Sequence, residues 1–533
     1  MIVNKESLPP DSLSANRQIA RAASLVTAAF VLSNLTGLVR QILAAKAFGT
    51  TDAMEAFNAA NRISETLFNL VAGGALGSAF IPTFTSLLAK EKRQDAWRLA
   101  SSIFNLILII TILLAGLAAV YAPQLIRYVI APGFAADPAK EALAISLTRL
   151  MLPSAVLFGL SGLVMGILNS RQRFFIPALT PAMYQLGMVF GVVVLSPKLG
   201  IYGLAWGVLI GAAGHLVLQL PLLLKQNGSY SPSLGLKSPY VREVARLMGP
   251  RLLGVAVVQL NFWINVRLAS MQPDGSVTAI QMAFTLMYMP QAAIAQSIAI
   301  AALPTFSTQV AKNKLTEMRG SLAATMRGIL LLSVPASLGL ILLREPIVAF
   351  IYQRGEFTAF STRLVAWALL WYSAGLVGHA LVEILARSFY ALHDTRTPVL
   401  IGMGAMSLNA GFSFLFSSLF QRWGWMPHGG LALANTLATA LEMVGLVLIM
   451  RRRLGGLEGS LLWAGLGKAL AAGALMAFGI WVWSSLAGNF PHWVFTLGGI
   501  LIAIVVYSTG LAILKTEELR QLTEAIQKRF SRS

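Results

Sequence analysis

Hydrophobic and polar positions alternate along this chain in long blocks, with extended apolar stretches separated by short polar ones. A helix of about 20 apolar residues crosses the roughly 30 Å hydrocarbon core of a bilayer, and about fourteen segments meet this length. They run over 22–46, 54–89, 99–121, 142–168, 176–196, 201–225, 245–270, 276–310, 321–345, 364–392, 398–420, 428–452, 461–486 and 493–515. The pattern predicts an all-α polytopic membrane protein with about fourteen transmembrane helices.

Composition agrees with this class and narrows the chemistry. Of the 533 residues, 56% are hydrophobic and only 12% are charged, about half the charged fraction of a soluble protein. The chain has no cysteine, which excludes disulfides, thiolate metal sites and thiol catalysis. The five histidines are scattered without metal-ligand spacing, so we expect no metal site.

The net charge of +20 could indicate nucleic-acid binding, but the basic residues follow alternate loops. Residues 90–98, 171–173, 312–314 and 451–453 are basic, whereas 487–492 is short and lacks lysine and arginine. By the positive-inside rule, the basic loops and both termini are cytoplasmic. The basic excess is therefore topological, with some attraction to anionic membrane lipids, and no nucleic-acid partner is expected.

An internal repeat divides the chain. "IPTFTSLLAK" (81–90) matches "LPTFSTQVAK" (303–312), 222 residues later, and "GILNSRQRFFIPAL" (166–179) parallels "LARSFYALHDTRTPVL" (385–400). An even number of spans between the copies makes the repeat parallel, so two six-helix lobes and a C-terminal helix pair are expected. The predicted parts are a cytoplasmic tail (1–21), a first lobe (22–225), a cytoplasmic linker (226–244), a second lobe (245–452), the helix pair (453–515) and a cytoplasmic tail (516–533). The first apolar segment is too long for a cleavable signal peptide and should stay as the first span.

Charged residues inside apolar segments are the candidates for function, because each costs about 3 kcal/mol or more at membrane depth. They are Arg40, Glu55, Arg62, Glu65, Arg149, Arg267, Glu383 and Arg387. Arginine binds phosphate through two parallel hydrogen bonds, so an anionic headgroup is the natural ligand. Glu55 is expected to hold a cationic partner in place. The alternatives are snorkelling for Arg40 and Arg267, and an intrahelical pair for Arg62 with Glu65.

Five motifs resemble one family. They are "GLVRQILAAKAFGTTDAMEAFNAANRI" (37–63), "GGALGSAFIPTF" (73–84), "GLVMGILNSRQRFFIPALTP" (162–181), "YQRGEFT" (352–358) and "RSFYALHDTRTPV" (387–399). The chain resembles the MurJ (MviN) lipid II flippases of the multidrug/oligosaccharidyl-lipid/polysaccharide exporter superfamily, over essentially its whole length.

This resemblance implies a flippase of the bacterial cytoplasmic membrane rather than an enzyme. Its substrate would be lipid II, an undecaprenyl-type lipid-linked anionic glycan that is the peptidoglycan precursor. Alternating access would move lipid II from the inner to the outer leaflet. The resemblance also implies a cationic cavity between the lobes, a lipid-tail groove at the last two helices, and cell-wall synthases as candidate partners.

The match is incomplete at the residues that would bind the substrate. Arg40 matches a family arginine, but Gln41 follows it in place of an acid, and Glu55 stands where the family has Asp. Asn34, Phe68 or Asn69, and Thr285 occupy positions that carry arginine in proteobacterial members. Arg62 and Arg267 are expected to supply substitute charge in the space between the lobes. We therefore predict substrate binding by Arg40, Glu55, Arg62, Arg267, Asn34 and Thr285, with Glu65, Arg149, Glu383 and Arg387 as gating or structural charges.

No Walker-type nucleotide loop is present, so no cofactor is expected. The driving force would be an ion gradient or the membrane potential, worth about 2.3 kcal/mol per charge per 100 mV. Alternatives are a flippase for another polyprenyl-linked oligosaccharide, a drug/cation antiporter, an enzyme acting on polyprenyl phosphates, and a non-transporting cell-wall scaffold. An antiporter for cations would favour an acidic cavity. An enzyme would need clustered carboxylates or a histidine constellation, and the sequence has neither.

Overall fold

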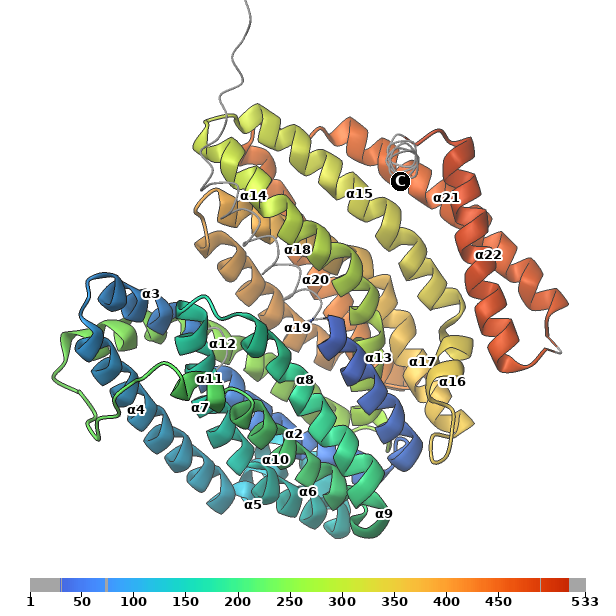
Figure 1. Ribbon diagram of the computed structural model, residues 1–533. Coiled ribbons are helices and arrows are strands. Elements are labelled where there is room, and N and C mark those ends of the chain that lie inside the picture. Colours follow the sequence, from blue (N-terminus) through green and yellow to red (C-terminus); the bar gives the residue numbers. More distant parts are fainter. Residues whose placement is uncertain (1–28, 30, 72–74, 489, 517–533) are drawn as a thin grey trace, which may run out of the picture. The chain divides into compact units, whose positions relative to one another are not determined.

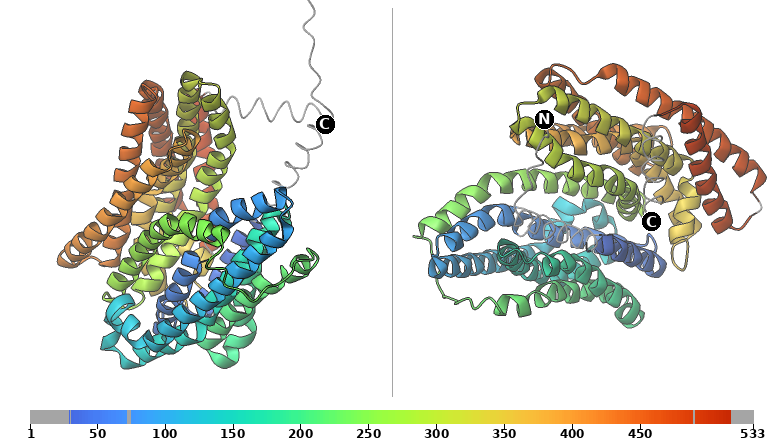
Figure 2. Two further views of the ribbon diagram at one scale, coloured as in Figure 1. Left: turned by 90° about the vertical axis from the view of Figure 1, so that its left-hand side faces the viewer. Right: turned by 45° about the horizontal axis from the view of Figure 1, so that its top comes forward.

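A computed structural model describes residues 29, 31–71, 75–488 and 490–516 (Figures 1 and 2), and its regular elements are all helices. Ten helices are long and apolar enough to cross a membrane, or twelve if two bent helix pairs each count as one span. Two of the expected segments fall outside this count. The first, 22–46, lies partly outside the described residues, and the second, 54–89, is interrupted at 72–74. The prediction of an all-α polytopic membrane protein is confirmed.

The described chain forms two compact units, Met1–Gln259 and Leu260–Ser533. The division falls inside α12 (Pro239–Ser270), which bends by 42° between Gly249 and Gly254. The predicted lobe boundaries stay predictions, as do the tails at 1–21 and 516–533, which lie almost entirely outside the described residues.

Unit 1 begins with a helix over 31–48. It continues with α2 (Asp52–Val71), α3 (Ala75–Ala89), α4 (Arg93–Val120), α5 (Ala122–Gln124), η1 (Leu125–Ile130), η2 (Pro132–Ala136), α6 (Pro138–Met151), α7 (Pro153–Ser170), α8 (Phe175–Phe190), η3 (Gly191–Leu195), α9 (Ser196–Leu199), α10 (Ile201–Val217) and α11 (Leu220–Leu224). A core of buried aromatic and aliphatic side chains, including Phe80, Phe84 and Trp97, joins α3, α4 and α7. This packing sets the frame in which the charged residues of α2 and α6 lie.

Unit 2 contains α13 (Ser276–Gln291), η4 (Ala292–Gln296), α14 (Ser297–Ala311), α15 (Leu315–Leu342), α16 (Arg344–Tyr352), α17 (Ala359–Ala374), α18 (Leu376–Ala391), α19 (Arg396–Arg422), α20 (His428–Arg453), α21 (Gly459–Leu486) and α22 (His492–Ile513). The last two pack together and against α15, drawn in red and yellow-green in Figure 1. Tyr507 of α22 donates a hydrogen bond to the carbonyl of Leu331 in α15, 2.8 Å away.

The sequence repeat has a counterpart in the helix boundaries. Ala75–Ala89 and Ser297–Ala311 begin and end 222 residues apart, as do Arg93–Val120 and Leu315–Leu342. Both members of the first pair contain an internal proline. The turns between these helices also agree, because each includes a non-glycine residue with positive φ, 222 positions apart. The same backbone path is therefore built twice.

The segment 226–238 lies along the first part of α4. Asn105 of α4 donates to the carbonyls of Ser231 (3.3 Å) and Ser233 (3.0 Å), and its own oxygen accepts from the Tyr230 hydroxyl (2.8 Å). Gly228 lies against Trp97, where a Cβ would come within 2.4 Å of the indole ring. The segment therefore occupies the polar face of an otherwise apolar helix.

Candidate functional site

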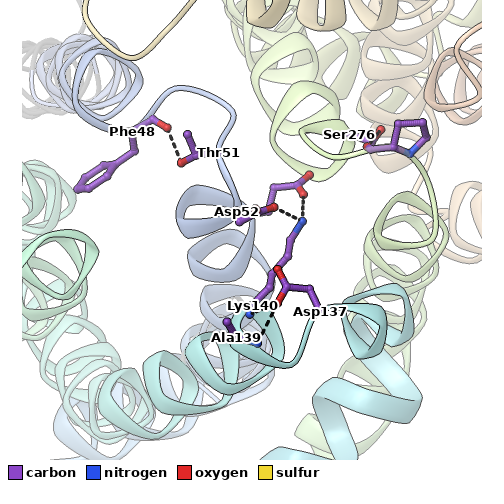
Figure 3. A network of polar contacts seen from close by, with 9 residues as sticks. Phe48, Thr51, Asp52, Asp137, Ala139, Lys140 and Ser276 are labelled. Atoms are coloured by element: carbon purple, nitrogen blue, oxygen red, sulfur yellow. Dashed lines mark hydrogen bonds and ion pairs between the residues drawn. The ribbon is translucent and has the colours of Figure 1, made fainter.

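Lys140 joins two acidic residues of α2 at a buried position in unit 1 (Figure 3). Its Nζ lies 2.6 Å from Asp52 Oδ1 and 2.6 Å from Glu55 Oε2. The Lys140 and Glu55 side chains are 5% and 3% exposed, whereas that of Asp52 is 51% exposed. One end of the network is therefore removed from water and the other faces it. A buried pair of this kind is strongly destabilised when one partner is lost.

The start of α6 explains why Lys140 points towards α2. Asp137 caps this helix, since its Oδ1 accepts from the backbone N–H groups of Ala139 (2.9 Å) and Lys140 (3.3 Å). Pro138 occupies the first helical position, where its missing N–H costs nothing. The Lys140 ammonium also lies 4.7 Å from the centre of the buried Phe134 ring, a cation–π contact that adds to its fixation.

The sequence analysis named Glu55 but missed its partner Lys140. The signal available was "DPAKE" (137–141), a helix start with cap, proline and lysine. It identifies a helix end, but it does not show that the lysine side chain is buried. Only the packing of α2 against α6 brings residues 85 positions apart into contact.

Arg40 lies half-buried in the helix over 31–48. Its Nη1 is 3.6 Å from the thioether sulfur of Met188 in α8, a weak acceptor, and its Nε is buried without a hydrogen bond. Among the described residues, no carboxylate forms an ion pair with this guanidinium. Arg40 is thus a permanent charge whose recorded protein contact leaves hydrogen-bonding capacity unused.

Arg62 forms an ion pair with Glu65 on its own helix, 3.0 Å apart. Asn61 also donates to Glu65, at 2.7 Å. For Arg62 the structure therefore has the intrahelical pair that the sequence analysis kept as the alternative. The expectation that Arg62 and Arg267 meet a substrate between the lobes stays a prediction.

The remaining predicted residues are dispersed. Asn34 is exposed, and Arg267 is half-buried in the last turn of α12. Thr285 bonds to the Gln281 carbonyl of its own helix, and Arg149 donates to the Ala119 carbonyl at the end of α4. Glu383 and Arg387 form an ion pair along α18 at 2.8 Å.

A second polar centre that the sequence analysis did not identify lies between α18 and α19. Asp394 accepts from the N–H groups of Arg396 and Thr397 and from the Thr397 hydroxyl, and it forms an ion pair with Arg453 at the end of α20. The Thr397 hydrogen bonds, followed by the Arg453 charge, lower the pKa of Asp394. This aspartate holds three helix ends together.

Comparison with known proteins places these features in a family. The family model described as "Lipid II flippase MurJ" matches residues 44–499. The lipid II flippase MurJ of Burkholderia cenocepacia is 31% identical over 475 residues, covering 87% of this chain and 90% of that protein. A probable lipid II flippase MurJ of Bdellovibrio bacteriovorus is 28% identical, covering 96% of this chain and 98% of that protein.

Solved structures agree on the fold. A lipid II flippase MurJ in an inward closed conformation has a TM-score of 0.78 at 24% identity, covering 92% of this chain and 98% of that one. An inward-facing multidrug resistance MATE transporter of the MOP superfamily has a TM-score of 0.68 at 14% identity, covering 81% of this chain and 96% of that one.

Proposed function

Because the chain belongs to the lipid II flippase MurJ family, we propose that it moves lipid II from the inner to the outer leaflet of the bacterial cytoplasmic membrane by alternating access. The family is one of transporters, so no covalent chemistry is assigned to the chain. Both termini are proposed to be cytoplasmic, as the distribution of basic loops favours.

Arg40 is the observation that carries the substrate proposal. A guanidinium held among membrane helices normally has a compensating partner, as Arg62 and Arg387 do here. Arg40 has instead a thioether contact and an unused buried donor. A diphosphate would supply the missing acceptors, two oxygens at a time, in the geometry that arginine fits best.

The Lys140 network has a different role in this proposal. Its charges already compensate one another, because one ammonium group meets two carboxylates. It is therefore assigned to holding α2 against α6 rather than to binding an anion. Energy for the cycle would come from the membrane potential or an ion gradient, and membrane lipids and cell-wall synthases are the proposed partners.

The test is complementation in a bacterium depleted of its own lipid II flippase. The unaltered chain is expected to restore growth, and Arg40→Ala to abolish the rescue while the protein still accumulates in the membrane. Losing charge-assisted hydrogen bonds of about 1.5–3 kcal/mol should weaken substrate binding roughly 10- to 100-fold. Arg40→Lys should rescue in part, since a point charge cannot bridge two oxygens.

The matched control is Arg127→Ala. Arg127 belongs to the same unit, but its side chain is exposed and lies 3.5 Å from Glu141, so its loss should leave the rescue intact. Full activity of Arg40→Ala would contradict the role of Arg40. If the unaltered chain accumulates in the membrane without restoring growth, lipid II is the wrong substrate and another polyprenyl-linked glycan takes its place.

A further inference from the structure

Glu442 is an acidic residue near the middle of the 26-residue helix α20, at the depth of the hydrocarbon core. It is half-buried. Within the described residues, no hydrogen bond or ion pair reaches its carboxylate. An ionised carboxylate at this depth costs several kcal/mol unless a cation neutralises it. A residue of this kind therefore indicates that some cation reaches it.

The neighbouring helix leaves room for this carboxylate at one glycine. A Cβ placed on Gly402 of α19 would lie 3.2 Å from Glu442 Oε1, tighter than almost all ordinary contacts of a Cβ. The carboxylate therefore lies against the backbone of α19, in a space that a larger residue at 402 would fill. Gly404 is different, because a Cβ there would meet nothing within 4 Å.

Glu442 continues a line of polar groups on α20. His379 of α18 hydrogen-bonds to Asn435 (3.0 Å) and Thr439 (3.4 Å), both on α20. Asn435, Thr439 and Glu442 are spaced four and three residues apart and therefore share one face of the helix. Four residues beyond His379 on α18 is Glu383, which is paired with Arg387 at 2.8 Å.

The two lines advance together. Gly375 of α18 lies against Thr436 of α20, and three residues later Gly378 lies against Thr439. The helices therefore run in the same direction, and Glu383 and Glu442 come at about the same level. Polar groups extend in this way from the His379 contact to the arginines that end α20.

Other titratable groups near this line are few. The helix α19 has none between Arg396 and Arg422. Of the remaining helices packed against α20, α17 contributes Tyr372, which is buried, and α13 contributes Tyr288, whose hydroxyl accepts from Gln296. Apart from Glu383, Glu442 is thus the one acidic group at this depth in the described part of these helices.

We propose that Glu442 binds and releases a proton during the transport cycle, with His379, Thr439 and Glu383 along its path. The step is the simple equilibrium between a carboxylate with a proton and a carboxylic acid, and the proton enters from water at one face and leaves at the other. This inference rests on the proposed function, since it names the ion that would drive lipid movement.

A proton fits the site better than a metal cation does. A metal ion needs several oxygen or nitrogen ligands at fixed distances. Within the described residues, no group of three His, Asp or Glu side chains converges on Glu442. A proton needs only one oxygen, and protonation removes the charge that is costly at this depth.

The experiment uses the purified full chain in lipid vesicles, with fluorescent lipid II, a pH-sensitive dye inside and an imposed membrane potential. Lipid II should cause proton movement in the unaltered chain. Glu442→Gln should lower that movement at least tenfold while lipid II binding persists, which shows that the fold is intact. Glu442→Asp should recover part of it. Gly402→Ala should impair it by displacing the carboxylate, and Gly404→Ala should not.

A second measurement separates this inference from the proposed function. Infrared difference spectra of the chain in lipid, recorded across acidic and alkaline pH without lipid II, should contain a carboxylic-acid band that Glu442→Gln removes. Lipid II movement without proton movement, or an infrared band unchanged by Glu442→Gln, would overturn the role of Glu442. Absence of lipid II movement with the band present and lost in Glu442→Gln would overturn the proposed substrate instead.

Discussion

At the scale of single residues, Lys140 determines whether Glu55 can remain inside the protein. Its ammonium is the group 2.6 Å from the Glu55 carboxylate, and Glu55 is almost fully enclosed. Removing one partner of a buried pair leaves the other charge without compensation, which typically costs about 3–5 kcal/mol.

We therefore expect Lys140→Met to lower the thermal unfolding temperature of the detergent-solubilised chain markedly. Glu55→Gln combined with Lys140→Met should recover much of the loss, because no buried charge then remains. Lys198→Met is the control, since Lys198 is exposed in the same unit. An additive double variant, less stable than either single variant, would contradict the pairing.

Asp394 gives a pH-dependent prediction. Its pKa is lowered in the folded protein, so the stability it contributes is fully present above its unfolded pKa of about 3.9 and is lost as pH falls through the lower folded value. Asp394→Asn should be less stable than the unaltered chain at neutral pH, and the difference should shrink below about pH 4. Unfolding temperatures measured across this range test it, and a difference that does not change with pH would contradict it.

How far the sequence reveals the site depends on the range of the interaction. Arg40, Glu55 and the pair of Arg62 with Glu65 could be predicted, because charge in an apolar segment and a spacing of three are local signals. Lys140 could not, because its burial depends on α2 packing against α6. Glu442 was visible as a charge in an apolar segment, yet its place beside Gly402 depends on the register of two packed helices.

At the scale of elements, the contact between α4 and the segment 226–238 explains why an apolar helix contains Ser101, Ser102 and Asn105 near one end. Ser101 accepts from the Ser231 N–H at 3.1 Å, and Asn105 binds two carbonyls of the segment. Polar groups on this face are thus satisfied by protein rather than by water.

Asn105→Leu should release the segment from α4. Trypsin cuts after lysine, and Lys225 and Lys237 flank the contact, so cleavage at these sites should become several times faster than in the unaltered chain. Ile110→Leu, at an exposed position of the same helix, is the control and should leave the rate unchanged. Equal cleavage of Asn105→Leu and the unaltered chain would show that the contact does not hold the segment.

At the scale of the whole molecule, the chain builds one helical path twice but places the charge network only once. The positions 222 residues after Glu55 and Lys140 are Val277 and Thr362, which do not form an ion pair. The repeat could be recognised from the sequence because proline and turn residues recur at one offset. The functional difference between its copies depends on side-chain contacts, which no offset reveals.

The proposed orientation is tested by single cysteines, since the chain has none of its own. His492→Cys should react with a membrane-impermeant maleimide added to intact cells, and Lys237→Cys should react only after permeabilisation. Both residues are exposed in the structure, so a missing reaction reflects membrane sidedness rather than burial. Labelling of Lys237→Cys in intact cells would contradict a cytoplasmic 226–238 segment.

The contact on α4 also has a consequence for the order of events at the ribosome. Asn105 emerges 128 residues before Ser233, a delay of roughly 6 to 26 seconds at about 5–20 residues per second. During that time α4 must enter the bilayer on the strength of its apolar second half, with Ser101 and Asn105 still facing water or lipid headgroups. The final depth of α4 is therefore set only after seven later helices (α5 to α11) have been synthesised, and a nascent chain stalled before residue 226 should hold this helix at a different depth.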